Sequence, residues 1–379
     1  MSAVRSACDT CLRRAWLLGR LAGHLEHAPR ARRALRDVLA LDDLRLIAAL
    51  GGGEVPVIHA ERAAFDPQVA RERTARAGLR AVCRHDRRYP ARLHDDTASP
   101  AVLFVRDRDE ALARLLGGGD LDTCPPAVAI VGARRAGPQA LETARALGRS
   151  LSAAGVTVVS GLALGVDSAA HEGALAGGGR TVAVLATGAD RTYPRTKVPL
   201  GERIAVSGAI VSELPPGTPA YRWAFPSRNR IIAALAQLTV VVEAAQRSGS
   251  LITADFAVQM GREVAAVPGP AAGPHCRGTN LLLRDGAHLV LEPADVLDGL
   301  LGIAGGAGLR PPTPLTPAPA ELTADLRRVR DAVAAGRATP AALADGPEDL
   351  VSVLAALSEL ELLGEVRRVP GGAYVATVR

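Results

Sequence analysis

The sequence predicts an open α/β domain with a parallel sheet in the middle of the chain. Apolar, β-branched runs recur at residues 127–132, 156–161, 181–188, 208–213, 238–244 and 263–269. Each run leads into a turn containing Gly or Ser and then into a segment of helical periodicity. Strands that are apolar on both faces and alternate with helices are typical of a parallel sheet covered on both sides.

The best-marked helix follows the first of these strands. Pro138 suits a first helical turn, and Gly155 is a stop signal. Between them one apolar face recurs at helical spacing, formed by Leu141, Ala144, Leu147 and Leu151. Ligands of such sheets bind outside the carboxyl ends of the strands, so we expect the functional side chains in the turns that follow them.

The chain is expected to contain three domains and a linker. Residues 1–75 read as a small helical domain, and Gly51-Gly52-Gly53 ends one of its helices. Residues 76–301 hold the sheet. Residues 302–320, rich in Gly and Pro, predict an extended linker, and residues 321–379 predict a compact C-terminal domain.

The composition argues against membrane and secreted proteins. Hydrophobic residues make up 48% and charged residues 22% of the chain, as in globular soluble proteins. No apolar run approaches the roughly 18 residues of a membrane span, and arginines interrupt the N-terminal segment where a secretory signal would be apolar. We therefore expect a cytoplasmic protein with no membrane partner. The net charge of +6 is too small to identify a ligand.

The five cysteines do not form the pattern of a disulfide framework. Cys8 and Cys11 make a Cys-x-x-Cys pair, but no second pair stands at zinc-ligand spacing. The expectation is an inert pair, with no metal and no cofactor. Metal or redox chemistry is the alternative.

The turn after the first predicted strand favours anion binding. Gly132 and Gly137 have the spacing of a phosphate-binding loop, but Pro138-Gln139 replace the Lys and Ser/Thr that ATP hydrolysis requires. What remains is a turn at a helix N-terminus with two candidate binding residues, Arg134 and Arg135. The alternative is a tight turn with solvated arginines.

The turn after the second strand excludes a dinucleotide site. Ser160-Gly161 stand where that site needs an acidic residue, and both are candidate binding residues instead. Asp167 is expected to cap the next helix, with His171 one turn later. An acid–base pair of these two side chains is the alternative.

Two further turns combine arginine with an aromatic ring and with small polar residues. Phe225-Pro-Ser-Arg-Asn-Arg230 opens a helix, and Arg247-Ser-Gly-Ser250 follows the fifth strand. Arginine charge beside a flat ring is how sequence-tolerant single-strand sites combine phosphate attraction with base stacking. This pattern predicts single-stranded DNA as the ligand, with candidate residues Phe225, Arg228, Asn229, Arg230, Arg247, Ser248, Gly249 and Ser250.

Structural roles remain open for three of these candidates. Phe225 could belong to the core, and Arg228 and Arg230 could pair with Glu213 or Glu243.

Eight segments between residues 127 and 287 together resemble one family. They are IVGARRAG, SGLALGVDSAAHEGAL, AVLATGADRTYP, VSELPPG, FPSRNRIIAAL, VVVEAAQRSGSLITADFA, GREVAAVPG and GTNLLLRDGA, in this order. They are similar to the DNA-processing protein A family. The resemblance implies an extended Rossmann-like, doubly wound domain, a homodimer formed through it, single-stranded DNA binding without sequence preference, and delivery of that DNA to the RecA recombinase in transformation and recombination.

The resemblance also implies a binding pocket made by Arg134, Arg222, Phe225 and Arg247-Ser248. Trp223, inside the same loop, is a further candidate for stacking. Lys197 departs from the family, which usually has Asn there. The N-terminal helices are similar to the family's small helical domain, of the SAM or helix-hairpin-helix kind.

The C-terminal residues resemble a winged helix. Such domains read DNA with their third helix, which would be Glu348–Leu363 here. That segment carries acidic residues and no basic one, so it would repel phosphates. We expect it to contact protein.

Two other functions compete with DNA binding. One is an enzyme acting on a nucleotide through paired carboxylates, for which Asp167, Glu213 and Glu243 are candidates. The other is a sensor of a nucleotide-derived signal. Since the Pro-Gly-Gly-x-Gly-Thr signature of the related enzymes is absent, we expect no catalysis.

Overall fold

The chain divides into two compact units, Met1–Thr313 and Pro314–Arg379. The computed structural model describes residues 7–28, 34–94, 98–119, 121, 124–304, 322–346, 348–363, 365–368 and 373–376. Most of the predicted linker, and the turn at 369–372 in the predicted wing, lie outside these ranges.

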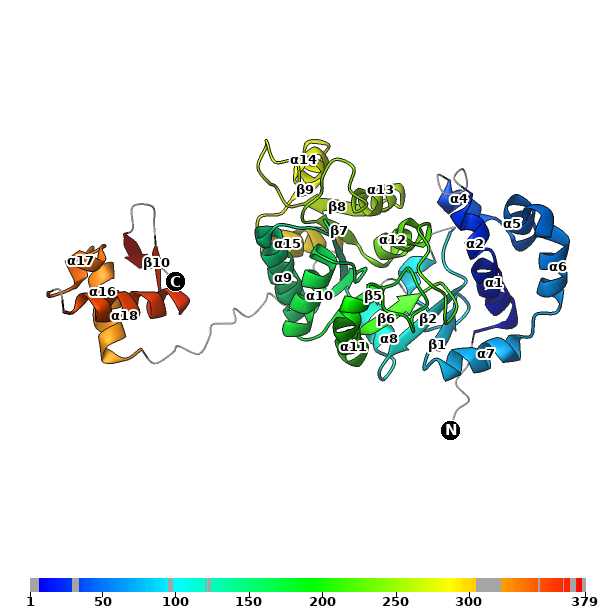
Figure 1. Cartoon of the computed structure of the whole chain (residues 1–379), viewed down its shortest axis with the longest axis horizontal. Coiled ribbons are helices and arrows are strands. Elements are labelled where there is room, and N and C mark those ends of the chain that lie inside the picture. The colour runs from blue at the N-terminus through cyan, green and yellow to red at the C-terminus, as the bar shows by residue number, and fades with distance from the viewer. Residues whose placement is uncertain are drawn as a thin grey trace. The chain divides into compact units, whose positions relative to one another are not determined.

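The first unit is built on a nine-stranded sheet in the order β1-β2-β6-β5-β4-β3-β7-β8-β9 (Figure 1). The strands are β1 (Arg80–Cys83), β2 (Val102–Asp107), β3 (Ala127–Val131), β4 (Thr157–Ser160), β5 (Thr181–Val184), β6 (Ala209–Ser212), β7 (Leu238–Val241), β8 (Glu263–Ala266) and β9 (His288–Leu289). The strands β3 to β9 all run parallel to one another. β2 runs antiparallel to both β6 and β1. Each of the predicted apolar runs contains one strand, so the prediction of a mostly parallel sheet is confirmed.

Helices cover both faces of this sheet. One face packs against α8 (Ala111–Leu116), α12 (Ala224–Leu235) and α13 (Leu251–Gln259). The other packs against α9 (Pro138–Ala153), α10 (Val166–Ala176), α11 (Val198–Ser207) and α15 (Pro293–Ala304). The arrangement is doubly wound and Rossmann-like, as expected. The remaining elements of this region are α14 (Arg277–Arg284), η2 (Ala91–Leu93) and η3 (Arg195–Lys197).

Helix α9 follows its sequence signals closely. Pro138 occupies its first turn, and the predicted apolar face is buried through Ala144, Leu147 and Leu151. Gly155 follows the helix with a φ of 87°, a conformation that glycine adopts without the strain of a Cβ.

The N-terminal helices belong to the same compact unit as the sheet. They are α1 (Asp9–Arg20), α2 (Ala22–Glu26), α4 (Leu35–Ala40), α5 (Asp43–Leu50), η1 (Gly52–Glu54), α6 (Val55–Ala63) and α7 (Pro67–Arg76). As predicted, α5 ends at the glycine triplet. Leu12 on α1 shares a buried cluster with Phe104 of β2, so these helices pack directly on the sheet. The predicted domain boundary at residue 76 falls at the end of α7.

The described residues of the second unit form three helices followed by a hairpin. They are α16 (Ala324–Ala334), α17 (Pro340–Leu343), α18 (Leu350–Leu362), β10 (Val366–Arg368) and β11 (Tyr374–Ala376). The strands of the hairpin pair antiparallel, and Leu357 and Val329 lie in one small core. This order of elements matches the order that the sequence predicts. None of the helices in the described ranges is long and apolar enough to span a membrane.

Candidate nucleic-acid interface

A cleft of about 690 Å³ opens at the carboxyl ends of β3 and β7. The chain moves from β3 through β4 and β5 to β6 in one direction and then returns to place β7 on the other side of β3. Such a reversal leaves a crevice where ligands of open α/β sheets bind. Residues from the turn after β3, the start of α12 and the loop after β7 line the cleft. The sequence predicted candidates in these three segments.

Three arginines on the cleft wall are exposed. Arg134 and Arg135 lie in the turn after β3, and Arg247 lies in the loop after β7. Over the residues that the structure describes, none of the three forms an ion pair with a carboxylate. Their charge is therefore free to meet phosphates.

Two aromatic rings lie beside these charges. The guanidinium carbon of Arg134 is 5.0 Å from the centre of the half-buried Phe225 ring. The Tyr193 ring is centred 5.8 Å from that of Phe225, at an interplanar angle of 60°. Tyr193 is 51% exposed, and it lines a small side pocket of about 100 Å³ together with Arg134 and Phe225. Sequence reasoning missed Tyr193, although the chain has only four tyrosines.

The loop after β7 is held by its own polar side chains. The Nδ2 amide of Asn229 donates to the carbonyl of Gly249 at 3.2 Å, which ties the loop to α12. The hydroxyls of Ser248 and Ser250 lie 2.8 Å apart and share a hydrogen bond. Ser248, Gly249 and Ser250 line the cleft beside Arg247.

Two amides of the turn before α9 form hydrogen bonds within the protein. The N–H of Gly137 donates to both carboxylate oxygens of Glu243, at 3.3 and 3.4 Å, and that of Ala133 donates to the Glu243 carbonyl at 2.7 Å. The chain's own carboxylate thus takes the place of an external anion. Gly132 lines the cleft, and Arg134 and Arg135 supply positive charge in this turn.

Arg228 forms part of the cleft floor and is only 5% exposed. Its Nη1 donates to the carbonyl of Val184 at 3.2 Å and lies 3.8 Å from Asp167. A Cβ on Gly161 would lie 1.1 Å from the same nitrogen, so glycine is required there. Burial lowers the pKa of Arg228 and raises that of Asp167, and the attraction between the two opposes both shifts.

Arg230 points into the core, away from the cleft. It is 2% exposed and pairs with Glu213 at 2.5 Å, while the hydroxyl of Ser227 donates to the other Glu213 oxygen at 2.7 Å. Arg230 therefore pairs with Glu213, which was the alternative to DNA binding. An arginine buried in this pair cannot reach a phosphate.

Three more candidates lie off the cleft. The buried hydroxyl of Ser160 donates to the carbonyl of Ile130 at 2.7 Å. Arg222 is exposed but does not line the cleft, and its N–H donates to Glu26 at 2.8 Å. The proposal that Trp223 stacks on bases is wrong, since its ring is fully buried and Nε1 donates to the carbonyl of Ala22 at 2.9 Å.

Asp167 and His171 do not form an acid–base pair. The N-cap of α10 is Gly165, and the Asp167 carboxylate instead accepts from the amides of Gly161 and Ala163. Nδ1 of His171 lies 2.7 Å from the hydroxyl of Thr181. Burial lowers the pKa of His171 to about 3, so the ring is neutral at physiological pH.

The fold and the cleft together define an α/β protein with exposed arginines at the carboxyl ends of its strands. Comparison with known families identifies the family. The sequence profile of the DNA recombination-mediator protein A family matches residues 80–301. The chain belongs to this family, which confirms the resemblance drawn from the sequence.

The relatives cover much of the chain. A putative DNA processing protein DprA of Mycobacterium tuberculosis is 38% identical over 311 residues, which are 78% of this chain and 73% of the relative. Protein Smf of Escherichia coli is 39% identical over 213 residues, 56% of this chain and 54% of the relative. The match thus spans about half the length of the Escherichia coli protein.

Two solved structures support the fold. The X-ray structure of DNA processing protein A from Streptococcus pneumoniae is similar with a TM-score of 0.61 at 29% identity, covering 78% of this chain and 98% of that one. A Helicobacter pylori DNA processing protein A structure, reported for its single-stranded DNA binding mode, gives 0.52 at 26% identity, covering 60% and 98%.

The buried pair of Arg230 and Glu213 yields a stability prediction. Glu213→Ala should lower the free energy of unfolding by about 3–5 kcal/mol, because it leaves the Arg230 charge buried without a partner. Urea unfolding measures this. Asp285→Ala removes a carboxylate from the exposed Arg284 pair and is the control, with almost no expected change. An equally small change for Glu213→Ala would contradict the structural role.

Proposed function

We propose that this chain binds single-stranded DNA in the cleft at the ends of β3 and β7, without sequence preference. The observation that carries the proposal is the exposed guanidinium of Arg134 over the ring of Phe225. It puts a phosphate-binding charge and a stacking surface at one place. A site of this kind accepts any base, because every base has a flat face.

Each part of the cleft has its own task in this proposal. Arg134, Arg135 and Arg247 attract backbone phosphates. Phe225 and Tyr193 stack on bases, and the loop of Ser248 and Gly249 lets the strand approach closely. Arg228 supports the floor from beneath and meets no phosphate directly, since its guanidinium is engaged by Val184 and Asp167.

The bound strand is then protected and delivered to the RecA recombinase, as expected for a recombination mediator. We assign the C-terminal unit, taken as a winged helix, to protein contact. On α18, Val351 is 76% and Leu354 42% exposed, and Glu359 and Glu361 are exposed beside them. Apolar and acidic groups on one helix suit a protein partner and repel DNA.

We infer that the protein is not a hydrolase acting through Asp167, Glu213 or Glu243, because each of these carboxylates has a structural partner. Asp167 lies beside Arg228, Glu213 pairs with Arg230, and Glu243 accepts from the amide of Gly137. A nucleotide hydrolase would need two of them free and facing one ligand.

A homodimer through the sheet domain is also part of the proposal. β9 is the last strand of the sheet, so one of its edges has no neighbouring strand among the described residues. Leu289 is 51% and the following Leu291 70% exposed there. Apolar side chains at an unpaired strand edge favour association with a second copy.

The first prediction concerns the choice of strand. The protein should bind a single-stranded oligonucleotide more tightly than the duplex of the same sequence, with no nucleotide or metal added. Stacking on Phe225 and Tyr193 requires bases that are not paired. Fluorescence anisotropy in one buffer compares the two. Equal affinities would contradict the proposal.

The next prediction separates the phosphate contact from the stacking contact. Arg134→Ala should weaken binding and reduce the log–log salt slope by about 0.7, the share of one phosphate on a single strand. Phe225→Ala should weaken binding by about 1–3 kcal/mol and leave that slope unchanged. Salt titrations of binding measure both quantities.

Two variants outside the cleft serve as controls for this pair. Arg45→Ala removes an exposed charge, paired with Asp42, from α5, and Phe65→Ala removes a ring that packs on Trp16. Neither should change binding by the folded protein. If Phe225→Ala lowers the melting temperature but the folded variant binds DNA with wild-type affinity, the ring belongs to the core. Its proposed stacking on a base would then be wrong.

The dimer has its own test. Leu289→Asp together with Leu291→Asp should convert the protein to a monomer, because charges at the edge of β9 would be buried in the interface. Sizing with light scattering at tens of micromolar measures the mass. Leu44→Asp, at an N-terminal side chain that is 57% exposed, is the control and should leave the mass unchanged. A wild-type protein that runs as a monomer would end this part of the proposal.

A further inference from the structure

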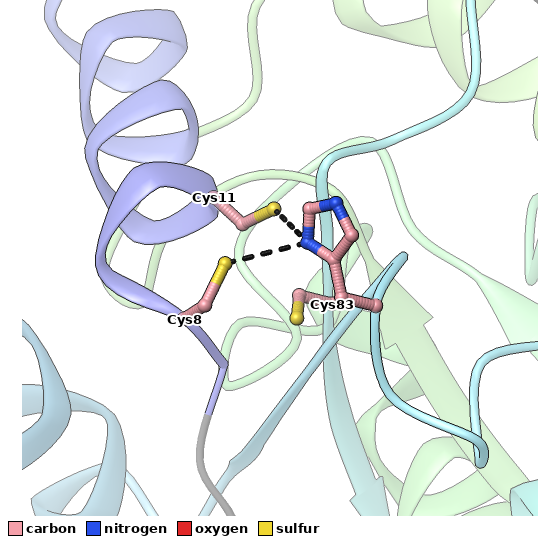
Figure 2. Close-up of side chains that lie close together, drawn as sticks. Cys8, Cys11 and Cys83 are labelled. Carbon is pink, nitrogen blue, oxygen red and sulfur yellow. Dashed lines mark hydrogen bonds between the residues drawn. The ribbon is translucent and has the colours of Figure 1, made fainter.

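Four potential metal ligands converge where α1 begins beside the end of β1 (Figure 2). Cys8 is the N-cap residue of α1, and Cys11 lies in its first turn. Cys83 is the last residue of β1, and His85 follows two positions later. The Sγ atoms of Cys8 and Cys11 each lie 3.4 Å from Nδ1 of His85, and the four donor atoms lie within 4.8 Å of one another.

We propose that Cys8, Cys11, Cys83 and His85 bind a structural zinc ion. Three thiolates and one imidazole form a common donor set of structural zinc sites. Bond lengths of about 2.3 Å to sulfur and 2.0–2.1 Å to nitrogen in a tetrahedron place ligands roughly 3.6–3.8 Å apart. The observed spacing needs only small side-chain adjustments to reach that geometry.

The surroundings of the cluster suit a structural site rather than a catalytic one. Cys11 and Cys83 are buried and Cys8 is half-buried, while His85 is exposed and forms the outer wall. Four protein ligands complete a tetrahedron and leave no open position for a substrate. The N-terminus of α1 also stabilises a thiolate at Cys8, the form that binds zinc.

An inert or redox-active Cys8–Cys11 pair is the competing interpretation. The inert pair was the expectation from the sequence, which rested on the lack of further ligands at zinc spacing. The fold supplies them from β1, far along the chain. A disulfide between Cys8 and Cys11 would need neither Cys83 nor His85, yet the Sγ atoms of both cysteines lie at equal distance from the His85 ring.

The ion would fasten the N-terminal helices to the sheet. In the sequence, the rest of α1 and the helices up to α7 separate Cys8 and Cys11 from Cys83 and His85. β1 is an edge strand of the sheet. A metal ion that closes so long a loop reduces the conformational entropy of the unfolded chain. It therefore raises the free energy of unfolding. The site lies outside the DNA cleft, since none of its ligands lines that cleft.

Metal analysis of the full-length protein tests the proposal. Protein purified with reduced thiols and without chelator should contain about one zinc ion per chain. Replacement by Co²⁺ should give the visible absorption of tetrahedral thiolate-bound cobalt. Chelation should lower the melting temperature by several degrees, and added zinc should restore it.

Variants distinguish a zinc site from a generally fragile region. His85→Ala, at an exposed position, should lose most of the bound zinc, and His85→Cys should retain it through a fourth thiolate. Cys276→Ser is the matched control outside the cluster and should keep the full metal content. Binding of single-stranded DNA by folded His85→Ala should equal that of the wild type, so the outcome does not depend on the proposed function.

Two results would overturn the proposal. One is reduced protein that contains no zinc and takes up neither Zn²⁺ nor Co²⁺. The other is a Cys8–Cys11 disulfide in protein isolated under non-reducing conditions whose reduced form has no affinity for either metal.

Discussion

The buried guanidinium of Arg228 is the contact on which the geometry of the cleft depends. It reaches from α12 to the carbonyl at the end of β5, lies beside Asp167 on α10, and packs against Gly161 after β4. One side chain thus fixes the start of α12 against two strand ends and helix α10. Phe225 stands one turn earlier on the same helix, so its ring is held at the rim by a contact beneath it.

The fold gives different roles to arginines that the sequence pattern alone does not distinguish. Arg134, Arg135 and Arg247 follow strand ends in turns, where side chains point to solvent. Arg228 and Arg230 belong to a helix packed on the sheet, and both are buried with carboxylates nearby. A buried charge stays stable only with such a partner, whereas an exposed one remains free for a ligand. The position of each arginine relative to the sheet therefore decides whether it has a structural role or is available to bind a ligand.

The sequence predicted the parts of the fold that local pattern controls. The six central strands and helix α9 follow from apolar runs, Pro138 and Gly155, because their signals lie within a few residues of each other. The hydrogen bond of Trp223 to Ala22 and the meeting of Cys83 with Cys8 join segments far apart in the chain. No spacing rule reports such contacts. Tyr193 was missed for the same reason, since only the folded chain brings its ring to Phe225.

The N-terminal helices connect the cluster of cysteines to the segment just before Phe225 on α12. At one end, α1 meets β1 through Cys8, Cys11, Cys83 and His85. At the other, α2 receives the indole N–H of Trp223, and its Glu26 accepts the amides of Arg222 and Trp223. Leu21 and Leu25 pack in the same cluster as Trp223. The second anchor is formed by hydrogen bonds and apolar contacts of its own, so it does not need the metal. The helices can therefore support the rim of the cleft from α2 even when the first anchor is loosened.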